Sequence, residues 1–424
     1  MKRKVNVSDV QMGMYISELD KPWLGSPFLF QGFKLEDDED LDKLKDYCEY
    51  VIVDDEQTDD GGGDDQTIRL SMRASPDGKT KITREEWARK AEDERRLTFQ
   101  QSMREALDLR DRTKGYVEQL FQDVRLGVSV NTEQAKVLVS EIVAKVAEDV
   151  DTMLWMTQLK NAHEYTQQHC MNVSVLAVAF GAHLGYPDEQ LQIIGLGALL
   201  HDIGKMKVPK EILDKPGKLT PEEFEIMKRH PAEGYELMKE SGQVPAGALQ
   251  IIRFHHERIS GKGYPDGLAG DQISTAVLLS AICDVYDAIT SDRVYHHGIP
   301  AHEGLNAMYQ LAPNDFGKEL MQEFIRCIGI YPVGSMVELK SGGVGIVLTN
   351  DPSNKLRPVV MLLRDPKGKE YLPRRYVSLS VQDELDKTGK WTVSRIVDPR
   401  NYGINMQQLA SQEVLDGGSQ VVHI

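Results

Sequence analysis

The residues of this chain best suited to chemistry are histidines and aspartates beside apolar, helical sequence. His201 and Asp202 open the sequence HDIGK, which directly follows the apolar run 191–200. An ionised carboxylate in such surroundings costs several kcal/mol unless charges or hydrogen bonds compensate it, and a divalent cation is the strongest compensation. Taken alone, the pair fits a structural His–Asp hydrogen bond as well as a metal site.

Two further sequences carry the same residue types. His255 and His256 end an apolar stretch within FHHERISGKGYP (254–265), and adjacent histidines at a helix end can serve two neighbouring metals. Asp284 and Asp287 lie in the apolar run 278–289, where residues three apart share a helix face. Each pair is therefore placed to act from one side of a helix.

Single histidines are weaker evidence. His169 alone is explained as a core histidine with a hydrogen bond, and His230 alone as a cap near Pro231. A metal site becomes the better interpretation because seven side chains of metal-ligand type lie on apolar helices or at their ends. The seven are His169, His201, Asp202, His230, His255, His256 and Asp284.

Helices must position these residues. The stretches 170–184, 191–200, 248–254 and 275–289 are apolar enough to form the core of an all-helical domain over 161–330. Thr220, Pro221 and Glu223 predict a helix start, with Thr220 as cap, Pro221 at the first position and Glu223 closing a capping box. We expect that helix to carry His230.

The remaining sequence predicts supporting parts. Residues 1–82 indicate a small α/β module, with extended segments at 14–17, 28–30 and 50–53, a helix at 40–48 and an acidic, glycine-rich linker at 54–65. Residues 83–160 indicate charged helices, which either support a homodimer or pack within one chain. Residues 331–424 indicate a β extension with strands at 336–339, 344–348, 359–363 and 376–379. The fold class expected is mainly α.

Composition excludes some partners. The 424 residues carry a net charge of −16, which argues against polymeric nucleic acid as a partner. The four cysteines form no CxxC pair, as is typical of a reduced compartment. No signal peptide and no membrane-spanning run is evident, so we expect a cytoplasmic protein without a membrane partner.

The order of the seven residues, together with HDIGKMKVPKEILDKPGKLTPEEFEIMKRHP, HHERISGKGYP and DVYDAITSDRVY, closely resembles the HD-GYP subgroup of HD-superfamily phosphohydrolases. The resemblance covers about 165–309. The N-terminal sequence 4–33 is similar to a module found before such domains. The resemblance implies a catalytic domain over 161–330 that binds two divalent metal ions, iron or manganese.

The resemblance also implies residue roles. Asp202 would bridge the two metals, with His169, His201 and Asp284 on one and His230, His255 and His256 on the other. Two such ions would activate a water molecule against a phosphodiester and stabilise charge on the phosphoryl oxygens. Some family members bind a third metal through a glutamate four residues before the first histidine, and Tyr165 occupies that position here. We therefore expect a two-metal site.

Other positions carry two interpretations each. Lys205 contacts a phosphate or assists the leaving oxygen, or it is a solvated lysine that complements a helix dipole. Arg293 is a similar case, with a bidentate phosphate contact as its functional interpretation. Gly263, Tyr264 and Pro265 form a rigid surface turn, or else a lip beside the substrate or a docking surface for a diguanylate cyclase. Asp287 bonds a metal-bound water or Lys205, or simply supports a ligand.

The expected reaction is hydrolysis of cyclic di-GMP to pGpG, GMP or both. An alternative substrate is 3′3′-cyclic GMP-AMP, which shares the phosphodiester skeleton and differs in one base. An alternative of another class is a non-catalytic module that senses a cyclic dinucleotide.

Overall fold

The computed structural model describes residues 2–19, 33–35, 41, 44–45, 48, 50–54, 84–128, 130–159, 165–291, 298–350 and 356–419. The chain divides into two compact units, Met1–Thr83 and Arg84–Ile424. No helix of the described part is long and apolar enough to cross a membrane.

The first unit contains a small antiparallel sheet in the order β1-β4-β2-β3. Its strands are β1 (Lys2–Asn6), β2 (Tyr15–Leu19), β3 (Phe33–Lys34) and β4 (Tyr50–Asp54). Ile16, Val51 and Val53 are fully buried in its core. Strand β1 was not predicted, because its sequence KRKVN is mostly polar; it is held by its pairing with β4. The predicted strand at 28–30 and nearly all of the linker lie outside the described residues.

The second unit begins with the charged helices. Helix α3 (Arg84–Arg125) is followed by α4 (Glu133–Glu148) and α5 (Val150–Thr157). The buried positions of α4 recur at helical spacing, and α4 packs against α6 and α7 of the central bundle. These helices therefore contribute to the same hydrophobic core as the helices that follow them.

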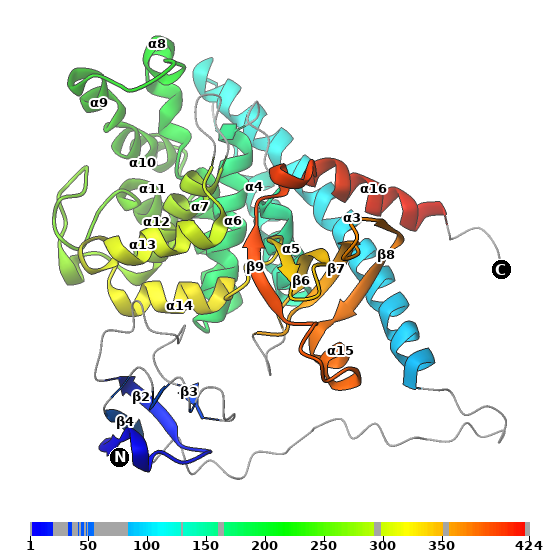
Figure 1. Ribbon diagram of the computed structural model, residues 1–424. Coiled ribbons are helices and arrows are strands. Elements are labelled where there is room, and N and C mark those ends of the chain that lie inside the picture. The colour runs from blue at the N-terminus through cyan, green and yellow to red at the C-terminus, as the bar shows by residue number, and fades with distance from the viewer. Residues whose placement is uncertain are drawn as a thin grey trace. The chain divides into compact units, whose positions relative to one another are not determined.

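The central bundle comprises α6 (Tyr165–His183), α7 (Asp188–Leu200), α11 (Ala246–Phe254) and α12 (Thr275–Thr290). Helix α6 packs between α7 and α12, and α7 also contacts α11. Helices α13 (Ala301–Asp315) and α14 (Lys318–Ile328) pack along α12 (Figure 1). The predicted mainly α fold with its apolar helices is confirmed.

One expectation about the segment between α7 and α11 is wrong. Thr220 and Glu223 form the predicted capping box at the start of α9 (Pro221–Met227), which follows the short helix α8 (Lys210–Leu213). Helix α9 ends there, however, and His230 is the first residue of α10 (His230–Glu240). The reason is Pro231, which disfavours continuation of a preceding helix and suits the first turn of a new one.

The chain continues into an antiparallel sheet of order β8-β7-β6-β5-β9. The strands are β5 (Met336–Leu339), β6 (Val344–Thr349), β7 (Val359–Arg364), β8 (Glu370–Ser378) and β9 (Val393–Val397). Helix α15 (Leu379–Leu385), the turn η5 (Pro399–Tyr402) and α16 (Met406–Ser419) complete the unit. The sequence analysis missed β9, an edge strand whose central Ser394 and Arg395 are exposed.

Successive strand residues face two cores. Met336, Ile346 and Met361 join the helical core, whereas their neighbours Val337 and Val347 pack in a separate cluster on the other face. This alternation is expected of strands covered on both sides. The β extension thus packs against the helical bundle through one face of its sheet.

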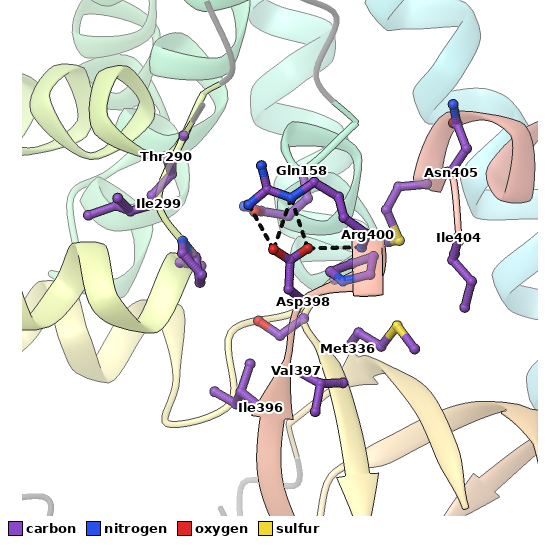
Figure 2. A pocket seen from close by; sticks show the side chains of 17 residues that line it. Gln158, Thr290, Ile299, Met336, Ile396, Val397, Asp398, Arg400, Ile404 and Asn405 are labelled. Carbon is purple, nitrogen blue, oxygen red and sulfur yellow. Dashed lines mark hydrogen bonds and ion pairs between the residues drawn. The ribbon is translucent and has the colours of Figure 1, made fainter. Parts of the chain in front are cut away.

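We call the contact between this sheet and the helices the seam. Phe99 of α3 packs on Trp155 of α5 and on Tyr376 of β8, with ring centroids 5.6 and 5.8 Å apart. The Tyr376 hydroxyl donates to Glu413 of α16 at 2.6 Å. A cavity of about 300 Å³ lies at the seam, where Gln158, Ile299 and other side chains surround the pair formed by Asp398 and Arg400 (Figure 2).

Candidate metal centre

The structure brings the seven predicted metal ligands together from five helices. His169 projects from α6, His201 and Asp202 follow the end of α7, and His230 begins α10. His255 and His256 follow the end of α11, and Asp284 lies in α12. Within three trios the possible ligand atoms all lie within 4.8 Å of one another: His230–His255–His256, His169–His201–Asp202 and His201–His255–Asp284.

Three imidazole rings are oriented by the same kind of hydrogen bond. Nδ1 of His201 donates to the Ala198 carbonyl at 2.7 Å, and Nδ1 of His230 and of His255 donate to carbonyls three residues earlier at 2.8 and 2.9 Å. A carbonyl oxygen can only accept, so Nδ1 carries the proton in each ring. In the neutral ring, Nε2 then carries a lone pair and no proton. Nε2 is also the atom that is directed into the cluster.

The inward-facing atoms do not satisfy one another. Nε2 of His230 and Nε2 of His255 lie 3.3 Å apart, and because each Nδ1 already donates to a carbonyl, both Nε2 atoms are placed to offer lone pairs to a cation. Nε2 of His201 and Oδ1 of Asp202 are buried without a hydrogen-bond partner. Buried polar atoms rarely remain unsatisfied. Their convergence fits a divalent cation, which accepts imidazole lone pairs and carboxylate oxygens.

His169 is held differently, between two carboxylates. Its Nδ1 lies 2.7 Å from Oδ2 of Asp287 and its Nε2 lies 3.1 Å from Oδ1 of Asp284. Burial would lower the pKa of His169, but the bonds to Asp284 and Asp287 outweigh it and raise that pKa to about 9. Nε2 must release its proton before it can coordinate a cation, whereas Nδ1 keeps its bond to Asp287.

The electrostatics favour the protonation states that metal binding needs. Burial opposes ionisation of Asp202 and Asp284, but neighbouring histidines, together with Lys205 beside Asp202, hold both carboxyl pKa values well below the usual range. Burial lowers the pKa of His255 and of His256 well below the ordinary value, so both rings are neutral. Anionic carboxylates and neutral imidazoles are the coordinating forms.

Lys205 lies at the cluster. Its Nζ donates to Oδ2 of Asp202 at 2.6 Å, and its side chain is 24% exposed. Burial would lower the pKa of Lys205, but the charge and hydrogen bond of Asp202 raise it above the ordinary value. The ammonium group is therefore charged and lies between the buried carboxylate and solvent.

A glycine explains how η3 (Ile203–Lys207) approaches α10. A Cβ on Gly204 would lie 1.9 Å from the His230 carbonyl oxygen and 2.6 Å from the Gly234 nitrogen. Any other residue would push the two segments apart. The glycine of HDIGK thus lets Asp202 and His230 come together.

The loop that contains Gly263, Tyr264 and Pro265 packs against His256. The Tyr264 ring stacks on the His256 ring with centroids 4.6 Å apart, and the Tyr264 amide donates to the His256 carbonyl at 3.3 Å. A Cβ on Gly263 would lie 2.4 Å from Cα of Glu257. Only glycine permits this approach.

Glu257 fixes the same loop from inside. It is fully buried, and its carboxylate accepts the amides of Asp266, Gly267 and Leu268 at 2.7, 3.0 and 3.0 Å. No role was expected for Glu257, although an acidic residue directly after His255 and His256 is a visible signal in the sequence. Glu257 ties the loop to the end of α11.

Asp287 supports His169 together with two residues that the sequence analysis missed. Besides His169, it accepts from Asn172 Nδ2 at 3.0 Å and from Ser291 Oγ at 3.3 Å. Asn172 lies three residues after His169 on the same helix, a spacing that could have identified it. Tyr165 begins α6, but its side chain lies outside the described part, as does the whole of Arg293.

Comparisons with known proteins identify the family of this chain. A domain of unknown function (DUF3391) matches residues 2–135, and an HD domain matches residues 145–320. Cyclic di-GMP phosphodiesterase PA4108 of Pseudomonas aeruginosa is 36% identical over 388 residues, 91% of each chain. The chain belongs to the HD-GYP family of HD-domain phosphodiesterases.

Other members of this HD-GYP family match only part of the chain. The cyclic di-GMP phosphodiesterase response regulator RpfG of Xanthomonas campestris is 40% identical over 160 residues, 36% of this chain and 42% of that protein. The 3′3′-cGAMP-specific phosphodiesterase 1 of Vibrio cholerae is 36% identical over 157 residues, 37% of this chain and 36% of that protein. The solved structure of Bd1817, an HDG"Y"P protein from Bdellovibrio bacteriovorus, covers 76% of this chain with a TM-score of 0.45 and 18% identity. Family membership makes the protein a metal-dependent phosphodiesterase.

Proposed function

We propose that this HD-GYP protein hydrolyses cyclic di-GMP to pGpG, GMP or both. The observation that carries the proposal is the convergence of lone pairs at the cluster, above all the 3.3 Å approach of the His230 and His255 Nε2 atoms. The relative that matches along 91% of both chains is named a cyclic di-GMP phosphodiesterase, which supports the substrate.

The cluster would hold two divalent ions, iron or manganese. Asp202 would contribute to both, with His169, His201 and Asp284 as ligands of one and His230, His255 and His256 as ligands of the other. When bound, the ions supply a positive field for an anionic phosphodiester and an activated water. The grouping of His230, His255 and His256 within 4.8 Å supports the second set.

The remaining chemistry falls to this chain's own side chains. Lys205 lies beside Asp202 with its charge toward solvent, where it can bind a phosphoryl oxygen or protonate the leaving 3′ oxygen. Arg293 is proposed as a second phosphate contact. Gly263, Tyr264 and Pro265 line the substrate side, because Tyr264 covers the partly exposed His256.

Further assignments complete the proposal. The functional division is 1–82, 83–160, 161–330 and 331–424, and the protein acts in the cytoplasm. A homodimer through 83–160, and a diguanylate cyclase bound at the Gly263-Tyr264-Pro265 loop, are the proposed protein partners. Polymeric nucleic acid is not a partner, given the net charge of −16.

A second substrate has specific support. Some relatives are named 3′3′-cGAMP-specific phosphodiesterases, and that dinucleotide presents the same bonds to the metals. A non-catalytic sensor is disfavoured, because seven side chains of metal-ligand type converge in one buried cluster.

The test uses the full chain, loaded anaerobically with Fe(II) or Mn(II), with metal content measured by elemental analysis. Cyclic di-GMP and 3′3′-cGAMP are incubated with it separately, and products are followed by chromatography. We expect pGpG or GMP to appear, and to be lost after chelation and restored by metal. Tight binding of either dinucleotide without turnover at full metal loading would favour the sensor instead.

A further inference from the structure

Three aromatic rings lead from the metal cluster to the surface. His256 stacks on Tyr264, with planes 29° apart and centroids 4.6 Å apart. Tyr264 in turn meets Phe224 of α9, with planes 82° apart and centroids 6.4 Å apart. The His256 side chain is 20% exposed, and Phe224 is 45% exposed. The series therefore joins a candidate metal ligand to an apolar ring that solvent can reach.

Helix α9 is not placed by the hydrophobic core. None of its residues is buried, and seven residues are too few for a helix to be stable by itself. The capping box of Thr220 and Glu223 starts the helix, and Lys215 bonds the Glu223 carboxylate at 2.6 and 2.8 Å. In Figure 1, α8 and α9 lie at the outer end of the helical part, beyond α10.

Exposure of one apolar side chain is common and needs no explanation. Phe224 differs because its ring continues an aromatic surface that begins at the cluster. Phe224 also lies six residues before His230, in a helix that has no buried side chain. Lys228 lies with its Nζ 5.5 Å from the Phe224 ring centroid, and its ammonium group forms an ion pair with Glu225 of the same helix.

This chemistry matches one part of a cyclic dinucleotide. Its phosphodiester must reach the metal cluster, and its bases need a π surface nearby. Aromatic side chains bind nucleobases by stacking. A guanine also presents the acceptors O6 and N7, which suit a lysine ammonium group. An exposed phenyl ring, beside a lysine ammonium group whose charge is balanced by Glu225, therefore fits a guanine base better than it fits a phosphate.

We propose that Phe224 is the base-stacking residue of the substrate site, on which a guanine lies while a phosphodiester occupies the metal cluster. The assignment rests on the proposed function. Phe224 does not touch the reacting atoms, so its contact with the base is equal in the ground state and the transition state. Loss of such uniform binding raises KM and leaves kcat unchanged.

The test compares Phe224→Ala, Phe224→Leu and Phe224→Tyr in the Mn(II)-loaded full chain. From the usual strength of base stacking, Phe224→Ala should raise KM for cyclic di-GMP about 5- to 100-fold, with kcat within about twofold. Phe224→Leu keeps apolar volume without a π face and should behave like Phe224→Ala. Phe224→Tyr should retain nearly the wild-type KM. Leu311→Ala, at a side chain of α13 that is 52% exposed, is the matched control and should change nothing.

Two readouts exclude a merely structural role. Metal content and turnover of methyl p-nitrophenyl phosphate, a diester without a nucleobase, should be equal in wild type and Phe224→Ala. An equal loss with both substrates, or a wild-type KM in Phe224→Ala or Phe224→Leu, would overturn the assignment.

The proposed function can fail separately from this assignment. The dissociation constant for a phosphorothioate analogue of cyclic di-GMP measures base binding without turnover. Wild-type protein that binds the analogue but cleaves no dinucleotide would disprove the reaction. The analogue's affinity in Phe224→Ala would still decide the stacking role, with an unchanged value counting against it.

Discussion

The metal cluster and the seam differ in whether their charged side chains have hydrogen-bond partners. At the cluster, His201 Nε2 and Asp202 Oδ1 are buried without partners and lie among other inward-facing ligand atoms. At the seam cavity, Asp398 accepts from the Arg400 guanidinium at 2.7 to 3.0 Å and from the Arg400 amide at 2.9 Å (Figure 2). The cluster atoms need a cation to satisfy them, whereas the Asp398–Arg400 pair at the seam is satisfied by its own hydrogen bonds.

The contrast shows what identifies a site in this protein. The seam encloses a cavity of about 300 Å³, yet the two charged side chains that it surrounds, Asp398 and Arg400, neutralise each other. The cluster is recognised instead by atoms that have no partner and by the carbonyls that orient them. Unsatisfied polar atoms, rather than empty volume, mark where a ligand stabilises the fold.

The largest expected effect is at Asp202. Asp202→Asn keeps the shape but removes the negative charge that the surrounding cations require. We expect loss of bound metal and a fall in kcat/KM of about 1000-fold or more, equivalent to ~4 kcal/mol of transition-state stabilisation. Elemental analysis and steady-state kinetics would measure both.

The seam supplies the matched control for that substitution. Asp398→Asn makes the same chemical change at a carboxylate that accepts hydrogen bonds from Arg400, and metal content and kcat/KM should remain at wild-type values. If Asp398→Asn and Asp202→Asn reduced metal content equally, the distinction between the two regions would be wrong.

A smaller effect is expected where a carboxylate acts through a ligand. Asp287→Asn replaces the acceptor that holds Nδ1 of His169 at 2.7 Å. Substitutions of such supporting groups typically lower metal affinity or activity about 10- to 100-fold. Competition with a chromogenic chelator would measure the metal dissociation constant. Unchanged affinity would mean that Asp284 alone is enough to hold His169.

The convergence of the seven side chains could be predicted because their types and spacing are unusual in apolar helices. HDIGK and FHHE stand at the ends of helices that the apolar pattern located, and the structure places those ends together. What could not be predicted are contacts between residues far apart in sequence. The bond from Asn172 to Asp287, the approach of Gly204 to His230 and the amides held by Glu257 all depend on the tertiary arrangement.

The same distinction explains the errors in the fold. Apolar alternation predicted β5, β6, β7 and part of β8, which are covered on both faces. It missed β1 and β9, because strand pairing there outweighs a polar sequence. The helix break before His230 was missed because the capping signal at Thr220 was visible, whereas the restart at Pro231 depends on one proline.

The seam contains its own ionisable group, and here the expected effect is on stability. Burial raises the pKa of Asp151 to about 6, and its carboxylate accepts from the Thr349 hydroxyl of β6. Because the folded-state pKa lies above the ordinary value, stability falls as pH rises from about 4 to 6. Asp151→Asn removes the free-energy cost of ionising a buried carboxyl and should stabilise the protein by about 1 to 3 kcal/mol at pH 7.5. Denaturant unfolding at pH 4 and pH 7.5 measures it, with little difference from wild type expected at the lower pH.

The smallest effect is expected at the pair that fills the seam cavity. Arg400→Ala removes a guanidinium that is 51% exposed and leaves Asp398, whose side chain is 25% exposed, to be solvated. Ion pairs of this kind contribute at most about 1 kcal/mol, so the free energy of unfolding should change by less than that amount. Metal content and kcat/KM should not change, because the charges of Asp398 and Arg400 compensate each other and do not compensate a charge in the cluster. A large loss of activity in Arg400→Ala would show instead that the cavity and the cluster are coupled through α12, whose Thr290 lines the cavity and whose Asp284 lies in the cluster.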